Sequence, residues 1–141
     1  MRSPRILLAF LAALPLTAGA QALAPASRDS RTPLFVSAEW LSDHLRDANL
    51  VLLHVGDPRD YPAVHIPGAR LVGLQDISIG DRAGGGLALE MPGADTLRAR
   101  LAALGISDDS RVILYYGKDW VSPATRVFLT LQWAGVGDNV S

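Results

Sequence analysis

The sequence predicts an α/β domain in which a parallel sheet carries helices on both faces. Residues 50–55 (LVLLHV) and 111–116 (RVILYY) are nearly continuous β-forming runs, as in strands that are buried on both faces. Helical patterns alternate with these strands along the chain, and such alternation is typical of parallel strands joined by right-handed crossovers. With 141 residues, of which 49% are apolar and 19% charged, the chain has the size and composition of one ordered domain.

The predicted elements of the first half begin with a short strand at 34–36. Ser37 follows as the N-cap of a helix, and the apolar face of that helix comprises Trp40, Leu41, His44 and Leu45. The strand at 50–55 ends at Gly56-Asp57-Pro58, and a third short strand is expected over 69–74.

An irregular segment, residues 75–92, separates these elements from the second half. We interpret Gly84-Gly85-Gly86 in this segment as a mobile surface loop, because no Lys-Ser/Thr follows the glycines as it would in a phosphate-binding loop. The helix that comes next is expected to end at Gly105. Its apolar face consists of Leu97, Leu101 and Leu104.

The last predicted helix follows the strand at 111–116. Ser122 is its expected N-cap and Pro123 its first-turn residue. Its apolar face consists of Ala124, Val127, Phe128 and Leu131, and Gly135 ends it. An α/β domain would normally begin another strand at this point, so we expect the domain, residues 34–141, to be incomplete at its C-terminus and truncated before its last strand.

Residues 1–22 have the pattern of a signal peptide. Arg2 and Arg5 precede an apolar run at 6–16, and small residues follow at 17–20. That run is about half of the roughly 20 residues that span a bilayer, and it lacks the alternation of a buried amphipathic helix. Residues 23–33 read as a flexible leader. We therefore expect an exported protein, periplasmic or secreted, with no membrane attachment after cleavage.

The chain contains no cysteine. This absence excludes a disulfide framework, a thiolate zinc site, an iron–sulfur cluster and a cysteine nucleophile. The formal net charge is −1, which argues against nucleic acid as a partner. We expect no cofactor and no metal.

The stretch from Tyr61 to Ala69 is the most informative part of the sequence. Pro67-Gly68 suits the two central positions of a type II turn. His65 would then lie at a rigid corner, and we expect it to hydrogen-bond the backbone rather than to act as a general base, since no nucleophile lies near it in sequence. A serine hydrolase built from His65 and Ser122 is disfavoured because Ser122 is better explained as a helix cap.

This stretch resembles the signature of the rhodanese-like domain. The matching pattern is Tyr61-x-x-x-His65-Ile-Pro-Gly-Ala-x-x-Val72, and the surrounding Ser37-x-x-Trp40-Leu41, Leu52-Leu53-His-Val55 and Val112-Ile-Leu-Tyr-Tyr116 fall in the expected order. The resemblance covers residues 34 to the end. It implies a parallel α/β sheet and descent from sulfurtransferases, which carry sulfane sulfur as a cysteine persulfide to a thiophilic acceptor such as cyanide.

The sequence departs from this family at the nucleophile. The resemblance places the family's cysteine at Tyr116, or alternatively at Gly117, and neither residue can carry sulfur. A phosphatase of the related fold also requires a cysteine, so it is excluded as well. The resemblance therefore assigns no catalytic residue to this chain, and Tyr61, His65, Pro67, Gly68 and Ala69 are expected to have structural roles.

The absence of cysteine is itself a feature of one group within the family. The run Ala124-Thr-Arg126-Val127-Phe128-x-x-Leu131-x-Trp133-Ala-Gly135 looks like the N-terminal, cysteine-free half of two-domain thiosulfate and 3-mercaptopyruvate sulfurtransferases. That resemblance implies a non-catalytic domain whose partner is a C-terminal catalytic domain of the same protein, which would bind the small-molecule sulfur donor. The alternative is a stand-alone, cysteine-free module that binds a partner or an anion through the same loop.

Six further residues lie on the strand at 111–116, in the loop after it and on the last helix. Arg126 could reach an anionic substrate such as thiosulfate, although we favour a structural ion pair. Trp133 is expected to pack in the core or against another domain, and Lys118 with Asp119 to form a solvated loop tip. Alternation along the strand should bury one member of Tyr115-Tyr116.

Overall fold

The computed structural model describes residues 33–80, 87–118 and 120–141. The predicted signal peptide, most of the predicted leader, the Gly84-Gly85-Gly86 loop and Asp119 lie outside these ranges.

Three parallel strands form the sheet. They are β1 (Leu50–Val55), β2 (Arg70–Leu71) and β3 (Arg111–Tyr116), in the spatial order β2-β1-β3. Strand β1 pairs with β3 in register from Leu50↔Arg111 to Val55↔Tyr116, and with β2 at Leu53↔Arg70 and His54↔Leu71. The central strand is thus β1, and the predicted parallel α/β architecture is confirmed.

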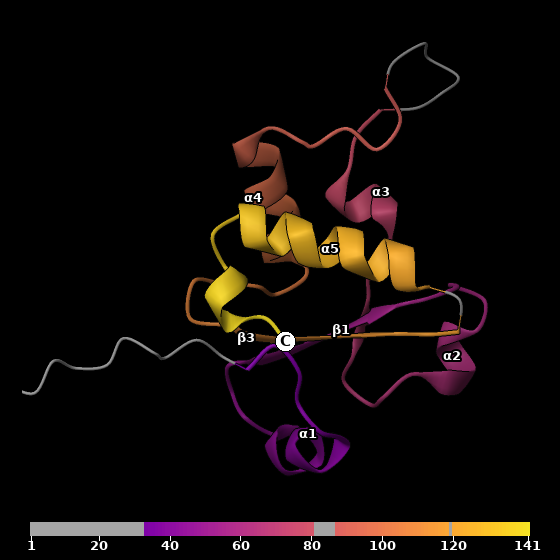
Figure 1. Ribbon diagram of the computed structural model, residues 1–141, viewed down its shortest axis with the longest axis vertical. Coiled ribbons are helices and arrows are strands. Elements are labelled where there is room, and N and C mark those ends of the chain that lie inside the picture. The colour runs from indigo at the N-terminus through magenta and orange to yellow at the C-terminus, as the bar shows by residue number, and fades with distance from the viewer. Residues whose placement is uncertain (1–32, 81–86, 119) are drawn as a thin grey trace, which may run out of the picture.

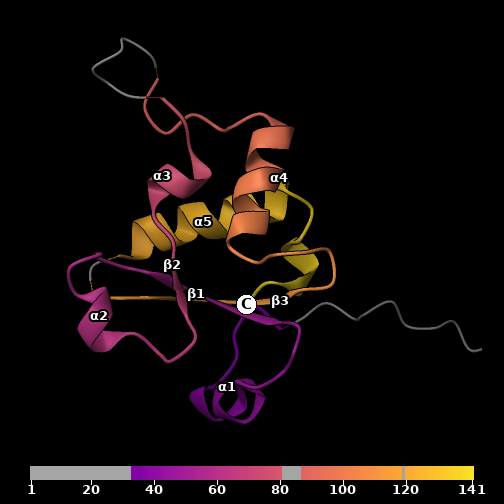
Figure 2. The ribbon, with the colours of Figure 1, turned by 180° about the vertical axis from the view of Figure 1, so that it is seen from behind.

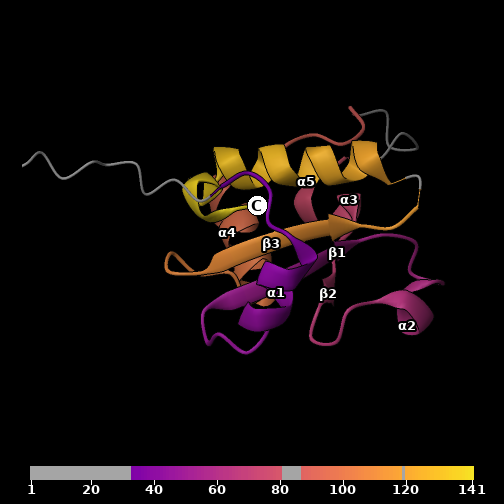
Figure 3. The ribbon, with the colours of Figure 1, turned by 60° about the horizontal axis from the view of Figure 1, so that its bottom comes forward.

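Helices cover both faces of the sheet (Figure 1). On one face lie α3 (Leu74–Ile77), α4 (Ala94–Ala103) and α5 (Val121–Trp133), and α1 (Ala38–His44) lies on the other, as Figure 3 shows from below. The short helix α2 (Tyr61–Val64) lies beside the sheet, near the end of β3 that leads into α5 (Figure 2). A 3-10 helix, Gly137–Asn139, follows α5.

The core is divided between the two faces because side chains alternate along each strand. Val51, Leu53 and Val55 of β1 pack in the larger cluster with α3, α4 and α5, whereas Leu52 points to the α1 side. The smaller cluster consists of Leu52, Ala69 and Ile113, covered by residues that include Val36, Trp40 and Leu41. Burial on both faces explains why β1 is an almost uninterrupted apolar run.

Three of the predicted helix boundaries are confirmed. The Ser37 hydroxyl accepts a hydrogen bond from the Trp40 amide at 3.1 Å, as an N-cap does. After α4, Gly105 has φ 74° and the Ile106 amide donates to the Leu101 carbonyl at 3.0 Å. Gly135 ends α5 in the same way, with φ 88°.

Three local predictions are wrong. Residues 34–36 form no strand, because residues 140 and 141 occupy the outer edge of β3. Val36 instead packs in the smaller cluster below the sheet, and Phe35 is 83% exposed. The strand expected over 69–74 contains only Arg70 and Leu71, since the amide of Gly73 hydrogen-bonds the Asp76 carboxylate at 2.7 Å and α3 begins at the next residue.

The third error concerns the start of the last helix. The N-cap of α5 is Trp120, whose carbonyl accepts from the Ala124 amide at 3.0 Å. Ser122 therefore lies inside the first turn rather than at the cap. Pro123 lies in the same turn, where its missing N–H leaves no hydrogen bond unmade.

The final residues of the chain lie against the outer edge of β3. Val140 forms a parallel bridge with Val112, the Ser141 amide donates to the Val112 carbonyl at 3.0 Å, and the Leu114 amide donates to the Ser141 carbonyl at 2.8 Å. The amides of Arg111 and Gly117 bond on the opposite side, to Asn49 and Val55. Alternate residues of β3 therefore serve two neighbours, as in the interior of a parallel sheet.

Candidate functional site

The order in which the strands are added to the sheet changes side at β1. The next strand in sequence, β2, lies on one side of β1, and the strand after it, β3, lies on the other side. In open α/β sheets, ligands bind at the carboxyl ends of the strands at such a switch point. A pocket of about 310 Å³ lies there, and we call it the strand-end pocket. It is lined by His54, Asp57, Arg59, Asp60, Ala63 and Val64 after β1, and by Gly117, Lys118 and Trp120 after β3.

The family-signature residues build a rigid corner next to this pocket. The Ala69 amide donates to the Ile66 carbonyl at 2.9 Å and Gly68 has φ 87°, so Pro67-Gly68 occupy the centre of a tight turn. His65 places Nδ1 2.6 Å from the Tyr61 carbonyl oxygen, and the two rings stack with centroids 4.2 Å apart. The corner is thus held by hydrogen bonds to the backbone at both ends.

Tyr61 closes the same corner from the opposite side. Its hydroxyl donates to the Ala69 carbonyl at 2.5 Å. The helix that contains Tyr61 and the strand that starts after Ala69 are therefore linked directly, and the position of α2 beside the strand-end pocket is set by the signature itself.

Sequence reasoning missed the partly buried pair of side chains that joins β1 to β3. Nδ1 of His54 lies 3.0 Å from the hydroxyl of Tyr115, and that hydroxyl also accepts from the Ile66 amide at 2.9 Å. Burial raises the pKa of the Tyr115 phenol, and it also lowers the pKa of His54, with a further contribution from nearby His65. The available signal was a histidine inside an otherwise apolar strand.

The other side of the His54 ring faces the strand-end pocket. A Cβ atom at Gly56 would collide with Nε2 of His54, and one at Gly117 would lie 3.5 Å from the same nitrogen. His54 is only 3% exposed. Its imidazole therefore fills the space above Gly56 and forms the floor of the pocket between two glycines.

Charged side chains form the rim of the pocket. Asp57 accepts from the Arg59 amide at 2.9 Å and from its guanidinium Nε at 3.0 Å. This guanidinium lowers the pKa of Asp57 to about 2. Two cationic side chains therefore lie beside the imidazole of His54. They are the Arg59 guanidinium, which is paired with Asp57, and the exposed Lys118 ammonium.

Tyr116 and Gly117, the two positions proposed for the family's nucleophile, point to different places. Gly117 lines the strand-end pocket and donates its amide to the Val55 carbonyl at 2.9 Å. Tyr116 is 52% exposed and lines a separate apolar hollow of about 500 Å³, together with Leu34, Phe35, Val121 and Phe128. Alternation predicted that one member of the pair is buried; Tyr115 is the less exposed of the two but only partly buried.

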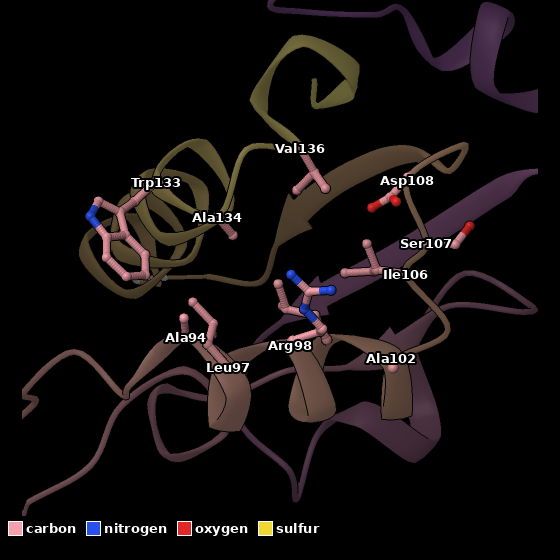
Figure 4. A pocket seen from close by; sticks show the side chains of 11 residues that line it. Ala94, Leu97, Arg98, Ala102, Ile106, Ser107, Asp108, Trp133, Ala134 and Val136 are labelled. Carbon is pink, nitrogen blue, oxygen red and sulfur yellow. The ribbon is translucent and has the colours of Figure 1, made fainter.

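Arg126 and Trp133 lie on α5 and do not line the strand-end pocket. Arg126 donates from its terminal nitrogen to the Leu89 carbonyl at 2.8 Å, while its Nε is buried without a hydrogen-bond partner. Trp133 is 59% exposed, which rules out a core position. It lines a third hollow, of about 470 Å³, between α4 and α5, where Arg98 and Asp108 also lie (Figure 4).

Two kinds of feature are missing from residues 33–80, 87–118 and 120–141. They contain no group of three or more His, Asp or Glu side chains placed to hold a metal ion. In the same ranges, every helix is too short or too polar to cross a bilayer.

Comparisons with known proteins agree with this geometry. The structure is similar to SseA from Escherichia coli, a 3-mercaptopyruvate sulfurtransferase, with 27% sequence identity and a TM-score of 0.64 over 78% of this chain and 44% of that one. It is also similar to YnjE, with 27% identity and a TM-score of 0.62 over 76% of this chain and 26% of that one.

The chain therefore spans less than half the length of these two structures. No curated protein sequence matches it. The family model of the rhodanese-like domain matches residues 37–141, a range that contains the whole sheet, the signature corner and the strand-end pocket. The chain belongs to the family of rhodanese-like domains.

Proposed function

We propose that this chain is the non-catalytic N-terminal domain of an exported sulfurtransferase. The whole protein would move sulfane sulfur from thiosulfate or 3-mercaptopyruvate to a thiophilic acceptor such as cyanide. The observation that carries the proposal is the complete absence of cysteine from a chain that belongs to the rhodanese-like family and is similar to a mercaptopyruvate sulfurtransferase.

The chemistry of sulfur transfer explains why this absence matters. A persulfide forms when a thiolate attacks the outer sulfur atom of the donor and the bond from that sulfur to the rest of the donor breaks, which releases sulfite from thiosulfate or pyruvate from 3-mercaptopyruvate. Only a thiolate supplies that nucleophile. At the end of β3, Tyr116 offers a phenol, which is un-ionised at neutral pH because its unperturbed pKa is near ~10. We therefore place the nucleophilic cysteine in a C-terminal catalytic domain of the same protein.

The lengths of the relatives and the surface of this chain support such a partner. The chain corresponds to 44% of SseA. Several large apolar side chains are exposed on and beside α5, and such exposure is typical of surfaces that another domain covers. They are Leu34, Phe35, Tyr116, Val121, Leu129 and Trp133.

Export is part of the same proposal. The pattern of residues 1–22 supports delivery to the periplasm or the exterior, and the lack of cysteine leaves no disulfide to be formed there. Membrane attachment is not required once such a segment is removed.

A stand-alone binding module is the second candidate function. It is favoured by one observation, namely that the strand-end pocket is lined with charged groups although the chain contains no cysteine. In that case the chain would bind its ligand without transforming it.

Two measurements separate these functions. The purified chain should form no thiocyanate from thiosulfate and cyanide above a protein-free blank, and the longer polypeptide encoded through the sequence after Ser141 should form it. Turnover by the chain alone would refute the non-catalytic assignment. A stop codon directly after Ser141 would favour the binding module.

A further inference from the structure

We propose that the hollow between α4 and α5 binds a free α-amino acid with a large apolar side chain. This α4–α5 hollow, of about 470 Å³, is lined by residues of α4, by residues 106–108 and by the C-terminal end of α5 with the residues that follow it. Residues 106–108 precede β3, whereas the strand-end pocket lies where β3 ends. The two sites are therefore at opposite ends of the sheet, and the proposal holds or fails independently of the proposed function.

The floor of the α4–α5 hollow is apolar and belongs to the core. Leu97 and Leu101 lie one turn apart on α4, and the chain folds back so that the Ile106 amide donates to the Leu101 carbonyl at 3.0 Å. These three side chains are at most 6% exposed and pack in the larger cluster. The floor is thus built without a ligand, and an apolar group placed on it would be removed from water with a gain in free energy.

Trp133 forms one side of the hollow. Its side chain is 59% exposed although it is the largest apolar one on α5. Figure 4 shows its ring on the same side of the hollow as Ala94 and Leu97 of α4. An exposed indole next to a packed apolar floor offers an aromatic surface against which a bulky apolar side chain can pack.

Two opposite charges lie above the apolar floor and do not pair with each other. Figure 4 shows the Arg98 guanidinium in the middle of the hollow and the Asp108 carboxylate on the side away from Trp133. Within residues 33–80, 87–118 and 120–141, the side chains of Arg98 and Asp108 make no ion pair or hydrogen bond. A ligand that carries both an anionic and a cationic group would satisfy both.

The arrangement of these three groups selects the class of ligand. An α-amino acid has its carboxylate, its ammonium and its side chain on one carbon atom. The carboxylate can accept two hydrogen bonds from the Arg98 guanidinium, the ammonium can donate to Asp108, and the side chain can pack against Trp133. A simple anion would be repelled by Asp108 and a simple cation by Arg98.

The size and exposure of the hollow limit the ligand and its affinity. A volume of about 470 Å³ falls within the range of roughly 300–1,000 Å³ that is usual for small-molecule sites. Arg98 and Asp108 are exposed, so water competes with the ligand for both charges. We expect a dissociation constant on the order of millimolar for an aromatic amino acid.

The first test is nuclear magnetic resonance of the full 141-residue chain at neutral pH and constant ionic strength. L-Phenylalanine should move the indole N–H signal of Trp133 and the amide signals of Arg98 and Asp108 with saturation. Phenylpropionate lacks the ammonium group and phenethylamine lacks the carboxylate, so each should bind about two- to fivefold more weakly. Equal affinities for the three compounds would show an apolar groove only, and no saturable shift with L-phenylalanine would equally overturn the proposal.

Charge variants assign the two ends of the ligand. Arg98→Ala should bind L-phenylalanine and phenethylamine equally, because the carboxylate loses its partner. Asp108→Asn should in the same way bind L-phenylalanine and phenylpropionate equally. Arg46→Ala and Asp109→Asn are the matched controls, since both residues are exposed and lie outside the hollow. The same losses in the controls would indicate a bulk charge effect and contradict the site.

Trp133→Ala tests where the apolar side chain packs. Because Trp133 is 59% exposed, this change should preserve the fold, which circular dichroism checks. Glycine carries both charges without a side chain, and we expect the wild type to bind it more weakly than L-phenylalanine. In Trp133→Ala the affinity for L-phenylalanine should fall toward that for glycine, and an unchanged preference for L-phenylalanine would contradict the placement of the side chain against the indole.

Discussion

The hydroxyl of Tyr115 on β3 lies 3.0 Å from Nδ1 of His54 on β1. These residues also face each other in the strand register, so the two strands are joined by a side-chain hydrogen bond in addition to their backbone ladder. The same hydroxyl accepts from the Ile66 amide, and it thereby ties the signature corner to the sheet.

Replacing Tyr115 by phenylalanine should destabilise the domain. The change leaves the Ile66 amide and Nδ1 of His54 without their shared partner in a partly buried site, and we expect a loss of about 1–3 kcal/mol in the free energy of unfolding. Urea unfolding monitored by circular dichroism measures it. Tyr116→Phe is the control, since Tyr116 is half exposed and should change stability by less than about 0.5 kcal/mol. Equal effects of the two changes would contradict the role given to Tyr115.

Gly56 is expected to tolerate no side chain. A Cβ atom there would collide with Nε2 of His54, so Gly56→Ala should displace the imidazole at a cost of about 1–3 kcal/mol in stability. Gly117→Ala meets the same nitrogen at an ordinary contact distance of 3.5 Å and serves as the control. The midpoints of thermal unfolding compare the two variants, and a neutral Gly56→Ala would show that the ring does not occupy this space.

The stability of the domain should fall on acidification through His54. Burial lowers its pKa below the ordinary 6.5, so the unfolded chain binds a proton more readily than the folded domain does. The contribution of His54 is present above pH ~6.5 and is lost as the pH falls through the folded pKa. Urea midpoints between pH 8 and pH 5 should therefore drop more steeply for the wild type than for His54→Gln. Parallel pH profiles would rule out this linkage.

A cysteine introduced at Gly117 should be more reactive than one introduced at Tyr116. A side chain at 117 lies beside the His54 ring and next to Lys118, and the positive charge of Lys118 stabilises a thiolate. The side chain at 116 lines the apolar hollow instead. We expect the thiol of Gly117→Cys to have the lower pKa and to be alkylated about tenfold faster at pH 7. The rates of alkylation by iodoacetamide compare the two variants. A faster reaction at position 116 would contradict the prediction that the environment of position 117 stabilises a thiolate.

Features determined by local sequence were predictable. The bounds of β1 and β3 follow from two uninterrupted apolar runs, and the ends of α4 and α5 follow from glycines with positive φ. Predictions failed where tertiary contacts decide the structure. Residues 34–36 have β-forming side chains, but the outer edge of β3 pairs with residues 140 and 141 instead.

The candidate site was harder to predict than the fold. The hydrogen bond between His54 and Tyr115 joins residues 61 positions apart, and the sequence offers no local pattern for such a contact. The signature corner was visible because its turn and its histidine are close together in the chain. The pocket itself results from the strand order, which brings the ends of β1 and β3 side by side.

The most direct test of the central claim is the intact mass of the purified chain after incubation with thiosulfate. A chain without a thiol has no group that can hold a sulfane sulfur covalently, so its mass should remain that of the untreated protein. A cysteine-containing rhodanese treated in parallel should gain the mass of one sulfur atom and lose it on addition of cyanide. The same gain and loss in this chain would contradict its assignment as a non-catalytic domain.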